Sequence, residues 1–253
     1  MYWSDRQIRS WHYHGLAYDL IKRQITIGSM RPGEQFPAER KLADTLGISR
    51  ATLREALKKL EADGYVNATR GSKGGNFVAS DDEINRIART CMMAQPDQVW
   101  RSLEYLRAIL DQASVLACNR RSPGTLNAMA RAVELLQKAK TGGDLREAQY
   151  LFLDAFSRAS INPLFVQGVE AALAGLCYPM PAESLALRAD RTTKLGIALL
   201  EAFRTRDETQ AAQLTTELVD LIADCVIKEM SSAQSNTGSS TETILDRAAR
   251  SSD

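Results

Sequence analysis

Residues 32–78 read PGEQFPAERKLADTLGISRATLREALKKLEADGYVNATRGSKGGNFV. Two segments of this stretch carry apolar residues at the spacing of one helix face. These residues are Leu42, Ala43 and Leu46 in the first segment and Leu53, Ala56, Leu57 and Leu60 in the second. Only Gly47-Ile48-Ser49 separates the two segments. Two short helices joined by such a turn are typical of a helix-turn-helix.

The flanking residues supply the expected helix boundaries. Residues 14–27 predict a preceding helix, which ends at the turn cluster of residues 28–33. We expect the next helix to open at Phe36-Pro37-Ala38-Glu39, with Pro37 near its first position. Ser49 is suited to cap the helix of residues 50–63, and Gly64 ends it.

Two short strands are predicted after this helix, at residues 65–69 and 76–79. The basic, glycine-rich run Arg70-Gly71-Ser72-Lys73-Gly74-Gly75 lies between them and predicts a hairpin tip. The expected fold of residues 1–79 is therefore a winged helix-turn-helix.

The first turn of the helix at residues 50–63 carries side chains suited to reading DNA. In a helix-turn-helix the N-terminal turn of the second helix reaches the base edges of the major groove. Arg50 and Arg54 lie four residues apart on one face, and arginine is the commonest reader of guanine. Ser49 and Thr52 can hydrogen-bond phosphates or bases.

Further cations flank this turn. Arg40, near the start of the preceding helix, is placed for the DNA backbone or an adjacent base, and Arg70 and Lys73 can enter a minor groove. A single exposed arginine is usually a solvated surface residue, and a glycine-rich hairpin is usually only a turn. The occurrence of all these features in one short stretch favours DNA binding.

The charge distribution agrees with this interpretation. The whole chain of 253 residues has a net charge of only +1. Residues 1–78, however, hold 13 Lys and Arg against 8 Asp and Glu, a net charge of +5, which leaves −4 for the remainder. A basic head on a mildly acidic body fits a DNA-binding domain joined to a domain of another kind.

The rest of the chain is expected to be helical. Its predicted helices span residues 81–94, 97–120, 123–141, 144–161, 163–177, 182–206 and 208–230. Pro96, Ser122-Pro123, Gly142-Gly143, Asn162-Pro163 and Pro179-Met180-Pro181 separate them. We predict a mainly α protein in which residues 80–230 form a bundle of six to seven helices for effector binding and dimerisation. Most of the polar residues 231–253 are expected to be disordered.

Several classes of protein are disfavoured. The sequence has no apolar run of membrane-spanning length and no signal-peptide core, so we expect a cytoplasmic protein with no membrane partner. The four cysteines are scattered, and free buried thiols are expected rather than zinc ligands or disulfides.

An enzyme needs a convergent catalytic site, and the sequence offers none. There is no His in the predicted bundle and no glycine-rich phosphate loop, and Asp111 and Asp154 are lone carboxylates on helices. The alternatives that stay open are a helical metabolite-binding protein or enzyme with an incidental basic head, and an architectural DNA protein without an effector.

The stretch of residues 32–78 resembles the N-terminal domain of GntR-type regulators. The resemblance rests on Pro32-Gly33, Pro37-Ala38-Glu39-Arg40, Leu42-Ala43, Ser49-Arg50, Arg54-Glu55-Ala56-Leu57, Leu60, Gly64 and Arg70-Gly71. It implies a homodimer that binds double-stranded operator DNA at a short inverted repeat, usually as a repressor. It places DNA contacts on Arg40, Ser49, Arg50, Thr52, Arg54, Arg70 and Gly71.

The helical second half resembles the FadR-like branch of that family, with its FCD domain. The stretches that carry this resemblance are residues 106–111, 156–159, 162–164 and 201–207. Many FCD domains bind a divalent metal through one Asp and three His. Here those positions are occupied by Leu153, Ser157, Gly196 and Glu217, so no metal cofactor is expected.

The resemblance implies that metal-free members of this branch include sensors of fatty acids and acyl-CoAs, so the missing ligands suggest a more apolar or acyl-type effector. An organic acid is the other effector class considered. Candidate anchors for the effector's anionic group are Arg107, Arg188 and Arg191, and Ser157 and Tyr178 could hydrogen-bond it. For each arginine a salt bridge is the alternative, and the two hydroxyl residues could equally belong to the core.

Overall fold

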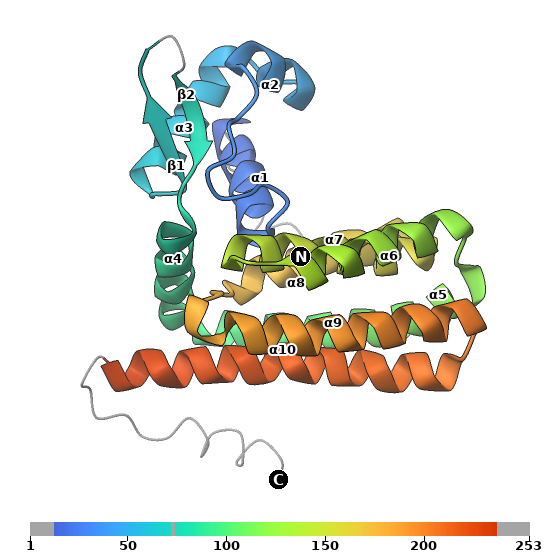
Figure 1. The fold of residues 1–253 in the computed structure, drawn as a ribbon. Helices are drawn as coiled ribbons and strands as arrows, with labels where there is room; N and C mark the ends of the chain where they lie inside the picture. The colour runs from blue at the N-terminus through green and yellow to red at the C-terminus, as the bar shows by residue number, and fades with distance from the viewer. Residues whose placement is uncertain (1–12, 72–73, 237–253) are drawn as a thin grey trace, which may run out of the picture.

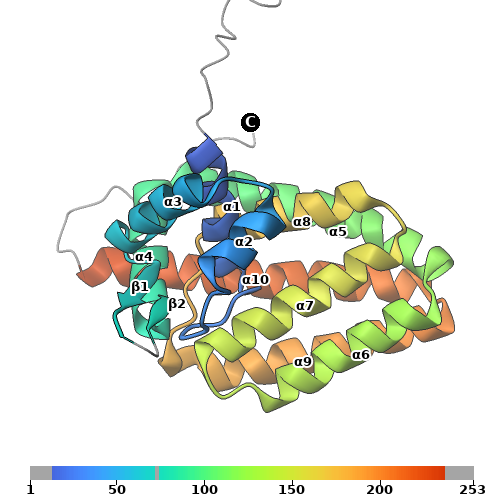
Figure 2. The ribbon, with the colours of Figure 1, turned by 90° about the horizontal axis from the view of Figure 1, so that it is seen from above.

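The computed structural model of the protein describes residues 13–71 and 74–236. It consists of a small head and a long helical bundle, and the head lies over one end of the bundle (Figures 1 and 2). The mainly α architecture expected from the sequence is confirmed.

The head contains three helices, α1 (Tyr13–Ile27), α2 (Glu39–Leu46) and α3 (Arg50–Ala62). Ser49 caps α3 as expected, because its hydroxyl accepts a hydrogen bond from the Thr52 amide. The apolar face of α3 is buried against α1 and consists of Leu53, Ala56, Leu57 and Leu60. The periodicity of the sequence therefore identified the core face of this helix correctly.

Helix α2 begins two residues later than the sequence suggested. Its N-cap is Ala38 and its first residue is Glu39, so Pro37 precedes the helix instead of opening it. The reason is that the chain is still extended beside the wing. Gln35 pairs with Phe77 in an isolated bridge, and the Phe36 amide donates to the Asn76 carbonyl at 2.9 Å.

The wing consists of strands β1 (Val66–Thr69) and β2 (Gly75–Val78), which pair antiparallel. The register places Val66 opposite Val78 and Thr69 opposite Gly75. This hairpin confirms the predicted wing, which lies beside α3 (Figure 1).

Seven helices follow within the described residues. They are α4 (Asp81–Ala94), α5 (Pro96–Arg120), α6 (Pro123–Lys138), α7 (Gly142–Ala159), α8 (Pro163–Leu176), α9 (Ala182–Thr205) and α10 (Glu208–Asn236). Helix α4 descends from the wing along one end of the bundle, and the others lie side by side beneath the head (Figures 1 and 2). Helix α10 extends beyond the expected end at residue 230, and residues 237–253 lie outside the described part.

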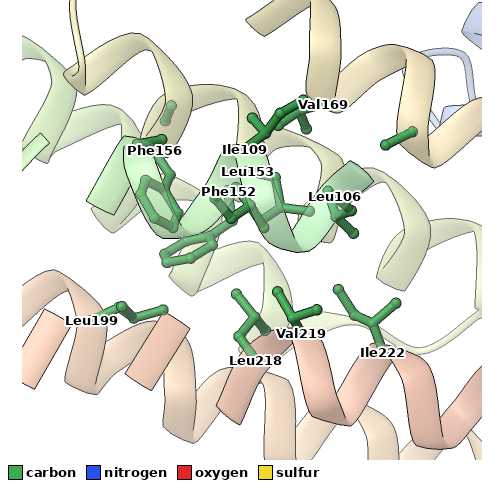
Figure 3. Packing of buried hydrophobic residues seen from close by; sticks show 14 of the residues in the cluster. Leu106, Ile109, Phe152, Leu153, Phe156, Val169, Leu199, Leu218, Val219 and Ile222 are labelled. Carbon is green, nitrogen blue, oxygen red and sulfur yellow. The ribbon is translucent and has the colours of Figure 1, made fainter. Parts of the chain in front are cut away.

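The bundle core is filled by aliphatic and aromatic side chains. Phe152 and Phe156 of α7 face Leu106 of α5 and Leu218 of α10 across the centre (Figure 3). All of these side chains are at most 3% exposed. The head has an apolar core of its own, and α4 contributes to both cores.

The sequence also misplaced the boundary at Gly142-Gly143. These glycines were expected to separate two helices, but they are the first residues of α7, and Thr141 caps the helix. The space around them explains why both are glycine. A Cβ on Gly142 would collide with the Met180 carbonyl, and one on Gly143 would lie 2.8 Å from the Pro32 ring.

The expectation of four free cysteines was wrong. Cys91 of α4 and Cys177, the residue after α8, form a disulfide, whereas Cys118 and Cys225 are free and buried. The partners are 86 residues apart in the sequence, so no local spacing could have revealed the pair. Among the described helices, none has the length and hydropathy needed to cross a membrane.

Gly28 provides a test of how closely the head packs on the bundle. Both Gly28 (φ +90°) and Gly33 (φ +76°) have left-handed backbones, but only Gly28 is crowded, since a Cβ there would lie 2.7 Å from Arg146 Cγ. We expect Gly33→Ala to lower the free energy of unfolding by about 1 kcal/mol. Gly28→Ala should cost roughly 1–3 kcal/mol more. Urea unfolding measures both; equal losses would contradict the proposed close packing.

Candidate DNA-binding surface and interdomain joint

The N-terminal turn of α3 is exposed and internally ordered. The Ser49 hydroxyl accepts from the Thr52 amide at 3.0 Å and lies 2.8 Å from the Thr52 hydroxyl. These bonds fix the first turn, and Arg50 projects from it into solvent. The Ser49 hydroxyl therefore has a structural role in addition to the DNA contact expected from the sequence.

Arg54 is held across the gap between the two helices of the motif. Its Nε donates to Glu39 Oε2 of α2 at 2.7 Å, while 62% of its side chain stays exposed. The terminal nitrogens of Arg54 thus remain available to a base edge. The sequence suggested Arg54 but not its partner Glu39, because residues 15 positions apart show no visible relation in a sequence.

The remaining DNA candidates belong to α2 or to the wing. Arg40 of α2 and Arg70 at the end of β1 are exposed. Gly71 has a left-handed backbone, with φ +118°, and its carbonyl accepts from the Gly74 amide at 2.9 Å. Lys73 lies outside the described residues.

Two of the five effector candidates are brought together. The Arg188 guanidinium of α9 lies 5.0 Å from the centre of the Tyr178 ring. Arg188 also donates to the Pro179 carbonyl at 2.9 Å and to Glu229 of α10 at 3.1 Å. Burial raises the pKa of Tyr178, and the neighbouring Arg188 opposes that shift. The charge of Arg188 is already balanced by Glu229, which is 8% exposed.

The other three effector candidates are apart from this pair. Arg107 forms a surface ion pair with Asp220 at 2.5 Å, and Arg191 is exposed on α9. Ser157 is fully buried and donates to the Leu153 carbonyl of its own helix at 2.7 Å.

The four positions that correspond to metal ligands do not fit a metal. Leu153 and Ser157 are buried in the core, and Gly196 packs against Phe152 and Val133. Glu217 is exposed and contacts only Gln213 among the hydrogen bonds of the described residues. In the described ranges no three His, Cys, Asp or Glu side chains gather as a metal site would require.

Arg146, which the sequence did not single out, joins three parts of the chain. This α7 side chain is 5% exposed. Its Nη2 donates to Asn85 Oδ1 of α4 at 2.8 Å, and its Nη1 lies 3.4 Å from Asp81 Oδ1. Asn85 in turn binds the Met180 amide at 2.8 Å and the Met180 carbonyl at 3.1 Å. We call Asp81, Asn85, Arg146 and Met180 the interdomain joint.

Burial and charge act in opposite directions on Arg146. Desolvation lowers the pKa of its guanidinium, and the Asp81 carboxylate opposes that shift. Beside the joint, the head contacts α7 directly through Arg31 and Glu147, whose ion pair is 2.6 Å long.

Two cavities flank Arg146 and Tyr178 where the head meets the bundle. The larger has a volume of about 190 Å³ and is bounded by α1, α4, α5 and the end of α8. The smaller, of about 30 Å³, reaches Leu153 and Ile222. Both cavities have Thr26 of α1 and Arg146 of α7 in their walls, so each lies between the head and the bundle.

Lys22 of α1 gives the larger cavity a positive charge. Its ammonium lies 5.3 Å from the Tyr65 ring centre and 5.6 Å from that of Tyr18. In the described part of the chain, none of the ion pairs involves Lys22. With Arg146 and Gln98 also in the wall, the cavity is suited to a small anion.

Comparison with known families matches each domain separately. The family described as bacterial regulatory proteins, gntR family, matches residues 15–78. The family described as FCD domain matches residues 102–221. The first range is the head, and the second lies within α5–α10.

Individual relatives are similar over part of their length. An Escherichia coli K12 protein, named as a regulatory protein of an L-lactate dehydrogenase operon, is 36% identical over 158 residues, 59% of either chain. A fatty acid metabolism regulator protein of Yersinia pestis is 30% identical over 160 residues, 60% of this chain and 64% of the relative. The chain thus spans about three fifths of the curated relatives it matches. A solved structure of E. coli McbR/YncC is 19% identical, with a TM-score of 0.46 over 86% of this chain and 98% of that one.

Asp81→Asn should destabilise the protein because it leaves the buried Arg146 without its counter-charge. We expect a loss of about 2–4 kcal/mol in the free energy of unfolding. The matched control is Asp190→Asn, which removes an exposed pair with Lys194 and should cost less than about 0.5 kcal/mol. Urea unfolding at neutral pH measures both. Similar small losses would mean that Arg146 does not depend on Asp81.

Proposed function

Because the gntR family matches residues 15–78 and the FCD domain family matches residues 102–221, we propose that the chain is a GntR-type, ligand-responsive transcription regulator and not an enzyme. The observation that carries the proposal is the exposed first turn of α3, where Arg50 and Arg54 stand free of the head core.

In this proposal α3 enters the major groove of operator DNA. Arg50 and Arg54 read base edges, and Arg40 contacts the adjacent backbone. The wing follows the minor groove with Arg70 and Gly71. A homodimer would present two heads to the halves of a short inverted repeat, and the regulator would act as a repressor that its effector releases.

The effector site we propose is the cavity between the domains. Its volume of about 190 Å³ is below the 300–1,000 Å³ typical of pockets for drug-sized ligands. This favours a small organic acid over an acyl-CoA. Lys22 and Arg146 would hold the carboxylate, and Tyr178 would line the apolar side.

Such a site would connect ligand and DNA directly. Lys22 belongs to α1 of the head, whereas Arg146 belongs to α7 of the bundle. A ligand that bridges them favours one head position over others, and this difference in affinity is what an allosteric effect requires. No metal is needed in this scheme, since the charge is supplied by side chains.

The double variant Arg50→Ala/Arg54→Ala tests the DNA surface. We expect it to bind the DNA upstream of its own gene roughly 100-fold or more weakly, since each bidentate contact is worth about 1–3 kcal/mol. Gel shift at several salt concentrations measures the affinity. The control Lys194→Ala/Arg204→Ala removes two bundle cations and should bind as the wild type does.

Circular dichroism and size-exclusion chromatography test whether the DNA-surface variant keeps the fold and oligomeric state of the wild type. Undiminished binding by that variant would refute the proposed contacts. If the wild type bound no selected DNA even at low salt, that result would favour the alternative function, a metabolite-binding protein.

The effector proposal is tested by isothermal titration with L-lactate, octanoate and octanoyl-CoA, using protein dialysed against EDTA. We expect a small acid to bind without added metal. Lys22→Met should weaken that binding at least about tenfold by removing the unpaired cation. Lys59→Met is the matched control, because Lys59 also lies over Tyr18 but not in the cavity wall.

Binding of octanoyl-CoA alone would argue for a different site that opens within the bundle. Binding restored only by added Zn²⁺ or Ni²⁺ would contradict the metal-free scheme.

A further inference from the structure

The disulfide lies where α4, the helix that follows the wing, meets the bundle. Cys91 is in the last turn of α4, and Cys177 directly follows α8, with their Cα atoms 5.9 Å apart. This separation is within the usual range for a bonded pair. The bond therefore ties the lower end of α4 to the bundle.

Both bonded cysteines are reachable, in contrast to the free ones. Cys91 and Cys177 are partly exposed and line the cavity of about 190 Å³ between the domains. Cys118 is fully buried and Cys225 is 9% exposed. A small thiol or disulfide can therefore approach the bonded pair through the cavity.

The disulfide adds to the hydrogen bonds and ion pairs that attach α4 to the bundle. The upper end of this helix is held by Asp81 and Asn85 of the interdomain joint, and Arg89 lies 3.6 Å from Glu229. Since α4 follows the wing after only two residues, its position determines where the head stands. Lys22 of α1 lines the same cavity from the head.

We propose that Cys91 and Cys177 are a reversible thiol–disulfide exchange site that controls the position of the head. The inference rests on the proposed function, because a DNA-binding protein works in a reducing compartment, where disulfides are usually transient or redox-sensing.

The reactant is a low-molecular-weight disulfide, RSSR. In the oxidising direction one protein thiolate attacks a sulfur of RSSR, whose S–S bond breaks and releases RS⁻, which takes up a proton. The second protein thiolate attacks the mixed disulfide and releases the second RS⁻. Two electrons pass from the protein thiols to RSSR, which leaves as two RSH, and the reverse sequence opens the bond.

The experiment equilibrates the full-length protein in buffers of graded glutathione to glutathione-disulfide ratio. Alkylation and mass spectrometry report the Cys91–Cys177 bond, and gel shift reports affinity for the DNA upstream of the gene. We expect the affinity to change at least about fivefold between the two states, with the same midpoint ratio as the bond.

Two variants complete the test. Cys91→Ser/Cys177→Ser should bind DNA with one affinity at every ratio, equal to that of the reduced wild type, while Cys118→Ser should respond as the wild type does. A bond that opens and closes with no change in DNA affinity would overturn the proposal, as would four free thiols at every ratio.

A failure of the proposed function can be distinguished from a failure of the exchange-site proposal. If neither redox state binds DNA, hydrogen exchange in α1 and α4 becomes the measurement. Faster exchange in both helices after reduction supports the exchange site, and unchanged exchange overturns it.

Discussion

The burial of one guanidinium constrains how the two domains meet. The Arg146 side chain is buried where the head meets the bundle. A buried charge is tolerated only when it is paired and hydrogen-bonded. Its partners, Asp81 and Asn85, both lie on α4, the helix that carries the head. The charge can therefore remain buried only while α4 stays against α7, so the position of the head depends on these contacts.

The space around the joint is shaped by glycine. Gly28 lets the end of α1 approach the backbone of Arg146, and Gly142 and Gly143 let Met180 and Pro32 approach the start of α7. A Cβ at any of these positions would separate head and bundle at the point where Asp81 Oδ2 accepts from the Gly143 amide at 2.8 Å. The three glycines therefore allow the close packing that keeps the Arg146 guanidinium buried beside Asp81.

The sequence predicted what depends on local spacing. The buried face of α3, its Ser49 cap and the hairpin of the wing follow from periodicity and turn chemistry within short windows. It did not predict contacts between residues that are far apart in the sequence. Glu39 beside Arg54, the cation Lys22 in the cavity and the Cys91–Cys177 bond become visible only in three dimensions. The prediction at Gly142-Gly143 was wrong because glycine occurs both where a helix is interrupted and where two segments pack closely.

The two apolar cores explain why such a joint could act as a switch. Ile84 of α4 belongs to the head core, while Met92, two turns later, belongs to the bundle core. Each core can stay intact while the polar ties between them rearrange. A contact built from Arg146, Asp81 and a solvent-accessible cavity has less apolar area to lose than either core. Movement of the head as a unit would therefore disturb mainly these polar contacts, and a ligand or a bond in the cavity lies where it can bias that movement.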